Sequence, residues 1–117
     1  MKYALLIYWD EKIGAENHDG PDIMKACYDH NIELAKEGVF LEGAPLHFTP
    51  TAKTVRVRDG ARIVSDGPFA ETKEQLGGYT VLECRDNDHA RQTVKETLEV
   101  QRNTSGGVEL HELPGDE

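Results

Sequence analysis

Two side chains in this sequence could do acid–base chemistry, and the first of them is a carboxylate. Asp66 stands at a corner formed by Gly67 and Pro68, because glycine frees the backbone and proline fixes the following φ. A carboxylate held there beside Phe69 would be partly desolvated, which favours a general base. The alternative is that Asp66 caps its own turn by accepting a backbone hydrogen bond. The residues alone favour this capping role.

His30 is the second candidate, because it is polar and lies on the inward stripe of a predicted helix. That stripe consists of Ile23, Cys27, His30 and Leu34, at spacings of four, three and four. A buried histidine beside a carboxylate titrates near neutrality and can relay protons. The alternative is a core histidine bonded to a backbone carbonyl or to the polar edge of the helix. If Asp66 and His30 share a cleft, each should shift the pKa of the other.

The other reactive residue types give weaker signals. Cys27 would be a nucleophile beside His30, but a buried inert thiol suits it better, because no cationic neighbour is evident. The five histidines lack HxxxH or HxH spacing, so we expect no metal and no cofactor. Tyr8 and Trp9 end the first predicted strand, where a cleft would open. They are candidate walls of a substrate site, with core packing as the alternative.

The elements that would position these side chains follow the order β-α-β-hairpin-β-α-β. Apolar runs predict strands over residues 3–9, 39–43, 78–84 and 108–113. One helix is expected to begin at Asp19-Gly20-Pro21 and to end at Gly38. A second helix is expected to begin within Asp86-Asn87-Asp88.

A hairpin is predicted before the third of these core strands. Residues 54–58 alternate between apolar and polar types, and Asp59-Gly60 is a strong turn signal. A two-residue loop would pair Val57 with Arg62. A three-residue loop with a bulge would pair Val57 with Ile63, and we expect this form because it matches the apolar faces better. Residues 71–75 are then expected to form one short helical turn.

This order of elements is typical of an α+β fold, a ferredoxin-like βαββαβ unit with an inserted β-hairpin, in a single domain over residues 1–117. Two helices cover only one face of such a sheet, yet residues 5–7 and 79–82 are apolar on both faces. A second copy of the chain is the simplest cover for the other face. We therefore expect a sheet-packed homodimer, a dimeric α+β barrel.

The composition excludes several classes of partner. A net charge of −9 argues against nucleic acid, whose phosphates need Lys and Arg, and against an anionic membrane surface. Two cysteines without CxxC spacing are typical of a reduced, cytoplasmic protein. We expect neither a signal peptide nor a membrane anchor, because no apolar run is long enough to span a bilayer.

Residues 66–79, DGPFAETKEQLGGY, resemble the signature of the DGPF-domain branch of the YCII-related (YciI-like) family. Residues 2–8 and 54–60 are similar to the same branch, and the resemblance extends from Met1 to about Glu112. It implies a ferredoxin-like, usually dimeric protein whose activity is mostly unknown. It also strengthens the functional role of the carboxylate at position 66, because Asn or Ser would cap the turn as well.

Some relatives of this kind carry a helix histidine with an aspartate, a pair thought to perform proton-transfer or elimination chemistry. Counted back from Gly38, that histidine position falls on Cys27 here. The pair is therefore not carried over, although His30 lies one turn away and could replace the histidine geometrically.

Two functional hypotheses follow. The first is a YciI-like protein that binds a small organic substrate and could act on it as an enzyme, with Asp66 as base or orienter and His30 as acid–base group. Its predicted substrate-binding residues are Tyr8, Trp9, Phe69, Glu71 and Lys73. The second is a non-catalytic dimeric ligand-sensing or regulatory module, associated with transcription initiation factors and meeting a protein partner.

Overall fold

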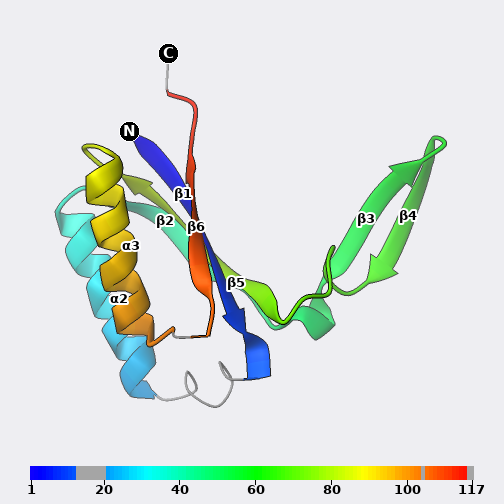
Figure 1. Ribbon diagram of the computed structural model, residues 1–117, viewed down its shortest axis with the longest axis horizontal. Coiled ribbons are helices and arrows are strands. Elements are labelled where there is room, and N and C mark those ends of the chain that lie inside the picture. The colour runs from blue at the N-terminus through cyan, green and yellow to red at the C-terminus, as the bar shows by residue number, and fades with distance from the viewer. Residues whose placement is uncertain (13–20, 104, 116–117) are drawn as a thin grey trace.

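The computed structural model describes residues 1–12, 21–103 and 105–115, so the expected helix start at Asp19-Gly20 lies outside the described residues. The predicted order of elements is confirmed (Figure 1). The elements are β1 (Lys2–Asp10), α2 (Pro21–Lys36), β2 (Phe40–Pro45), a short 3₁₀ helix η1 (Thr49–Thr51), β3 (Lys53–Arg58), β4 (Ala61–Asp66), β5 (Glu74–Glu83), α3 (Asn87–Gln101) and β6 (Gly107–Glu112).

Four of the strands form one antiparallel sheet in the order β2-β5-β1-β6. The two helices lie together on one face of this sheet (Figure 1). Two helices and antiparallel sheets make an α+β fold, and the strand order is compatible with the predicted ferredoxin-like unit.

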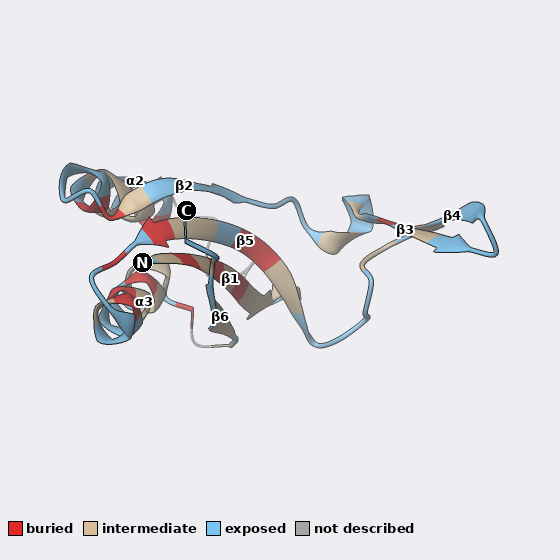
Figure 2. Cartoon of the chain, turned by 90° about the horizontal axis from the view of Figure 1, so that it is seen from above, coloured by how far each residue is buried: buried red, intermediate tan, exposed pale blue. Residues whose placement is uncertain are grey.

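The hydrophobic core lies between the helices and the sheet (Figure 2). Its largest fully buried side chains are Tyr3, Leu5 and Leu82, from the two central strands. Leu34 of α2 and Ala90 of α3 pack against them from the helix layer. Each buried aliphatic or aromatic side chain of this size contributes roughly 1.5–3 kcal/mol, so this layer supplies much of the stability.

The end of α2 and the start of α3 agree with the signals in the sequence. Gly38 follows α2 with φ 77°, a left-handed conformation that favours glycine. Asp86 caps α3 by accepting a hydrogen bond of 2.8 Å from the backbone N–H of His89. The predicted inward stripe of α2 is also confirmed at its two ends, where Ile23 and Leu34 are buried.

Strand β5 begins four residues earlier than predicted, and the expected helical turn over residues 71–75 is wrong. Glu74 and Gln75 instead pair with Asp10 and Trp9 at the end of β1. A bulge between Ile7 and Tyr8 in the register makes this longer pairing possible, because it leaves Gly77 of β5 without a partner on β1. Strand pairing therefore outweighs the local helical tendency.

The hairpin β3–β4 is confirmed, but the expected bulge is wrong. Val57 pairs with Arg62, so the loop contains only two residues. Asp59 and Gly60 both have positive φ, 52° and 75°, which is the geometry of a type I′ turn and matches the twist of the strands. The turn thus decides the register, although a bulge would have aligned the apolar residues better.

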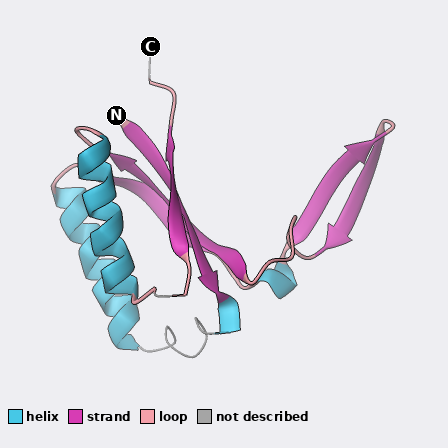
Figure 3. Ribbon diagram, viewed as in Figure 1, coloured by secondary structure: helices cyan, strands magenta, loops and turns pink. Residues whose placement is uncertain are grey.

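This hairpin, residues 53–66, projects from the four-stranded sheet on the side away from the helices, and we call it the arm (Figure 3). In the described part of the chain, β3 and β4 pair only with each other. A two-stranded hairpin is at best marginally stable by itself in water, so an uncovered arm of this kind needs a further contact.

None of the helices in the described part of the chain has both the length and the apolar run needed to cross a lipid bilayer.

Candidate functional site

An open cleft of about 520 Å³ lies between α2 and the strands β1, β2 and β5. We call it the α2 cleft. Its largest side chains are aromatic, and they come from three different elements: Trp9 from β1, Tyr28 from α2 and Phe40 from β2. Its described lining residues are Ile7, Trp9, Ile23, Met24, Cys27, Tyr28, Asn31, Phe40, Gly43, Ala44, Pro45, Gly77, Gly78, Tyr79, Thr80 and Gln101.

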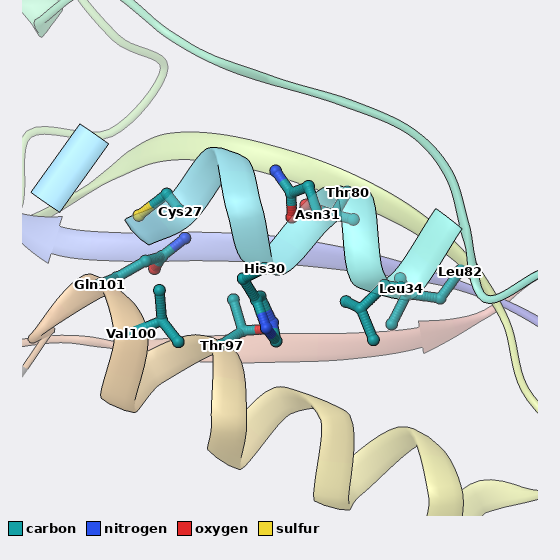
Figure 4. Close-up of a pocket in the computed structure, with 9 residues that line it drawn as sticks. All are labelled: Cys27, His30, Asn31, Leu34, Thr80, Leu82, Thr97, Val100 and Gln101. Atoms are coloured by element: carbon teal, nitrogen blue, oxygen red, sulfur yellow. The ribbon is translucent and has the colours of Figure 1, made fainter. Parts of the chain in front are cut away.

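A smaller cavity of about 30 Å³ adjoins the cleft between the two helices, as the shared lining residues show (Figure 4). His30 lines this cavity and hydrogen-bonds to Thr97 of α3, with 3.0 Å between Nε2 and Oγ1. The predicted core histidine is therefore paired with a side-chain hydroxyl rather than with a backbone carbonyl. His30 thus faces the small cavity and is not one of the residues that line the α2 cleft.

Burial lowers the pKa of the His30 imidazole below its ordinary value, although the charges of Glu96 and Glu37 partly oppose this shift. The ring is thus neutral at pH 7. A neutral imidazole donates a hydrogen bond from one nitrogen and accepts one at the other, which suits hydrogen bonding and proton uptake more than charge pairing.

Cys27 and Gln101 face the same space, as do Asn31 and Thr80. Burial raises the pKa of the Cys27 thiol, so this residue stays protonated and is a weak nucleophile, in agreement with the inert thiol that the sequence favours. Among the described residues, the side-chain oxygen of Gln101 is buried without a hydrogen-bond partner. Gln101 lines both the cleft and the small cavity, so its amide is available to a bound molecule.

Asp66 does not lie in this cleft. It ends β4 at the base of the arm, with its side chain 86% exposed, and it forms an ion pair with Lys53 of the facing strand. The hydrogen bond from Lys53 lowers the pKa of Asp66, which disfavours a general base. Within one chain the structure therefore does not bring Asp66 and His30 together, because the arm extends away from the helix layer (Figure 1).

The remaining predicted site residues are divided between different surfaces. Trp9 lines the α2 cleft, and its role in substrate binding stays a prediction. Tyr8 lies on the opposite sheet face, where burial and the carboxylate of Glu109 raise its pKa. Phe69 is exposed beside the arm, and the centre of its ring lies 4.7 Å from the guanidinium carbon of Arg56.

Glu71 and Lys73 are exposed in the connection that leads from the arm to β5, and the described ion pairs include none between them. Their proposed role in substrate binding, like that of Phe69, stays a prediction.

The residue pattern of the helices indicates some of the residues that line the small cavity, although it does not show that they form a cavity. Thr97 and Gln101 fall on the inward face of α3, where a polar residue needs a partner, just as His30 does on α2. Asn31 and Tyr28 had no such signal, because each lies beside the apolar stripe rather than on it. The described residues contain no group of three His, Cys, Asp or Glu side chains placed to hold a metal ion.

Comparison with known proteins gives the class of this protein. The YCII-related domain model matches residues 1–112, nearly the whole chain. The chain therefore belongs to the YCII-related family. An uncharacterised protein of Rhizobium meliloti (strain 1021) is 33% identical over 118 residues, covering 97% of this chain and 92% of that protein.

The separation of Asp66 from His30 leads to a first prediction. Asp66→Asn should leave the pKa of His30 unmoved, whereas Glu96→Gln should lower it further, because Glu96 is one of the charges that favour the imidazolium. Both changes can be followed by the ring protons of His30 in a proton NMR titration. A shift in Asp66→Asn would show instead that the two residues meet, for example across two chains.

The same titration has a consequence for stability. The folded state holds the His30 pKa below the ordinary value of 6.5, so the unfolded chain binds the proton more readily. This histidine therefore destabilises the fold as pH falls below about 6.5 and has no such effect at higher pH.

Proposed function

We propose that this YCII-related protein binds a small organic molecule in the α2 cleft. The observation that carries the proposal is the cleft itself, which falls within the roughly 300–1,000 Å³ typical of ligand sites. Its aromatic walls and its polar inner end are also typical of such sites, which bury a ligand and then orient it by a few hydrogen bonds.

For a catalytic role, His30 is the acid–base candidate among the described residues, in the small cavity that adjoins the cleft. Its neutral imidazole could take up a proton from a substrate in a proton-transfer or elimination reaction. Thr97 would hold the ring in place by the hydrogen bond to Nε2. Asp66 could serve such a reaction only from another chain, because in its own chain it lies on the arm.

One observation favours the second candidate function, a ligand-sensing or regulatory module without turnover. No carboxylate is found among the described lining residues of the cleft or the small cavity, so His30 has no acidic partner there. A histidine that transfers protons usually depends on a carboxylate partner, which orients the imidazole and stabilises its protonated form. An association with transcription initiation factors would belong to this second function.

The cleft can be tested through its tryptophan. Trp9 is the only tryptophan of the chain, so its indole N–H gives a single resolved signal in a ¹⁵N–¹H spectrum. Members of a metabolite and fragment library that raise the melting temperature are expected to shift this signal, because ligands of the folded state stabilise it. Stabilising ligands that leave the Trp9 signal unchanged would place the site elsewhere.

We further propose that the protein is a sheet-packed homodimer of the dimeric α+β barrel type. The sheet face away from the helices, which we call the open face, is apolar along its centre. Leu6 of β1 pairs with Tyr79 of β5, and Ala4 pairs with Val81, so these four residues share that face. The open face of a second chain would cover this apolar surface with the same apolar residues.

The arm supports the same assembly. Val55, Val57 and Val64 expose 59%, 64% and 56% of their surface, and cross-strand pairing and alternation place them on one face of the arm. Three exposed β-branched residues on so small an element indicate a surface that becomes covered. The arm and the open face lie on the same side of the molecule, away from the helices (Figures 1 and 2).

Charge makes a second copy of the chain a suitable partner for the arm. Residues 53–66 contain four of the 13 Lys and Arg residues but only two of the 22 acidic residues. The arm is therefore basic, while the rest of the chain has nine basic and 20 acidic residues. An arm that meets the body of another copy brings opposite charges together.

The dimer predicts a mass in solution of twice the 13.1 kDa chain, measurable by light scattering at micromolar concentration. Leu6→Asp should reduce this to the mass of one chain, because it places a charge at the centre of the open face. Ala35→Asp, at an exposed position of α2, is the control and should leave the mass unchanged. A wild-type monomer at this concentration would contradict the assembly.

A further inference from the structure

We infer that the ligand of the α2 cleft is an uncharged, partly aromatic molecule whose hydroxyl or N–H group donates a hydrogen bond to Gln101. This inference rests on the proposed function, since it specifies what the cleft binds.

The absence of charge from the lining carries the first part. None of the 16 described residues that line the cleft is Asp, Glu, Lys or Arg, although these types make up 30% of the chain. A charged ligand would lose its hydration there without meeting an opposite charge, which is unfavourable for either sign. An anion would also be repelled by the net charge of −9.

The walls indicate the shape and surface of the ligand. Trp9, Tyr28 and Phe40 are three of the eight aromatic residues of the chain. Tyr28, at the side of the cleft formed by α2, exposes 66% of its surface. A flat ring can stack against such side chains or meet their edges, and it would remove their apolar surface from water.

Gln101 carries the hydrogen-bonding part. Its side-chain oxygen is a hydrogen-bond acceptor, and it is buried without a partner among the described residues. Figure 4 shows the Gln101 side chain reaching from α3 toward α2, near Cys27. A buried acceptor without a partner destabilises the empty site, and a donor on the ligand would remove that penalty.

Neither His30 nor Cys27 provides a strong hydrogen-bond partner for the side-chain oxygen of Gln101. His30 Nε2 is already bonded to Thr97, so the imidazole offers the cleft at most its other nitrogen. Cys27 is a weak donor and acceptor. A hydroxyl or N–H on the ligand is therefore the group that Gln101 can bind most strongly.

Four naphthalene derivatives that differ in one substituent test each part separately. At pH 7, 2-naphthol is uncharged and has a donor, and 2-methoxynaphthalene is uncharged and has none. 2-Naphthoate carries a negative charge and 2-naphthylmethylammonium a positive one. Affinities can be measured from the shift of the Trp9 indole signal, since Trp9 lines the cleft. The expected order is naphthol first, the ether roughly fivefold weaker, and both ions weaker still.

A matched pair of variants connects the donor preference to one residue. Gln101→Leu should abolish the preference for naphthol over its methyl ether while leaving the affinity for the ether nearly unchanged. Gln92→Leu removes an exposed amide from the same helix and should keep the full preference. The Trp9 signal also shows whether each variant is folded.

The outcomes separate this inference from the function beneath it. Equal binding of naphthol and its ether, or a preference that survives in Gln101→Leu, would overturn the hydrogen bond. Tighter binding of either ion would overturn the uncharged ligand. If no naphthalene shifts the Trp9 indole signal but other library compounds do, the proposed ligand class is wrong, while the α2 cleft is still the binding site. If no compound shifts the Trp9 indole signal, both the proposed ligand class and the proposed ligand binding in the α2 cleft are wrong.

Discussion

Gly106→Ala is expected to destabilise the protein by roughly 3 kcal/mol, the upper part of the range for overpacking. A β-carbon at this position would lie 2.0 Å from the carbonyl oxygen of Tyr8 and 2.8 Å from the Cα of Trp9. Both are backbone atoms of the central strand β1, so no side chain can rotate to make room. The loop before β6 or the end of β1 would have to move.

Several hydrogen bonds oppose such a movement. The side-chain amide of Asn103 donates to the carbonyl of Tyr8 at 2.9 Å and accepts from the backbone N–H of Gly106 at 3.2 Å. The backbone N–H of Asp10 donates to the hydroxyl of Ser105 at 3.1 Å. The loop is thus held against β1 before Gly106 by these bonds and after it by the pairing of Gly107 with Tyr8, and a shift would break bonds of partly buried groups.

Gly107→Ala is the matched control, because a β-carbon on this next residue would have no atom within 4 Å. Urea unfolding of both variants, followed by circular dichroism, gives the difference in free energy. Equal midpoints would mean that the loop can withdraw from β1 at little cost, and that the hydrogen bonds of Asn103 do not hold it.

The parts of the fold that were predictable from the sequence are those that depend on local signals. Asp86 marks the start of α3 because its side chain can satisfy a free backbone N–H there, and Gly38 marks the end of α2 because it adopts a positive φ. Alternation along residues 54–58 and the Asp59-Gly60 turn similarly identify the hairpin.

Errors arose where two local rules disagreed or where pairing partners decided the outcome. The register of the arm followed the type I′ turn, not the alignment of Val57 with Ile63. The start of β5 followed its pairing with Trp9 and Asp10, which are more than 60 residues away in the sequence. The first competition needs the relative strengths of two local preferences, and the second depends on contacts distant in sequence, so residue types alone decide neither.

The candidate site was predictable only in part, for the same reason. The inward position of His30 on α2 follows from helical periodicity, and so does that of Gln101 on α3. That both end in one space depends on how the two helices pack. A cleft shared by Asp66 and His30 was one hypothesis from the sequence, but within one chain the projection of the arm separates them, and no pattern within residues 53–66 indicates where a hairpin points.

Gly77→Ala is expected to damage the α2 cleft more than the fold. A β-carbon on Gly77 would lie 2.4 Å from the Nε1 of Trp9 and 2.6 Å from its Cε2. These atoms belong to a side chain, so the indole can move away while the backbone of β1 and β5 stays paired. We expect only a modest fall in stability but a changed Trp9 indole signal and a changed fluorescence maximum.

The displaced indole should also weaken ligand binding by roughly tenfold, the equivalent of about 1.4 kcal/mol. Trp9 is a wall of the cleft, and its ring meets Phe48 edge-on, with 6.2 Å between centroids and 86° between planes. A shifted ring would therefore lose both its packing against Phe48 and its surface toward the ligand. Affinity for 2-naphthol, or for any library compound that binds, measures this loss.

Gly107→Ala is again the control, because it adds the same methyl group at a position with free space around it. It should keep the Trp9 spectrum and the ligand affinity of the wild type. If Gly77→Ala shows an unchanged indole signal, the ring does not lie against Gly77. If the signal changes but affinity does not, Trp9 lies at the cleft without contacting the ligand. The bulge at Gly77 would then serve the pairing of β5 with β1 rather than the shape of the site.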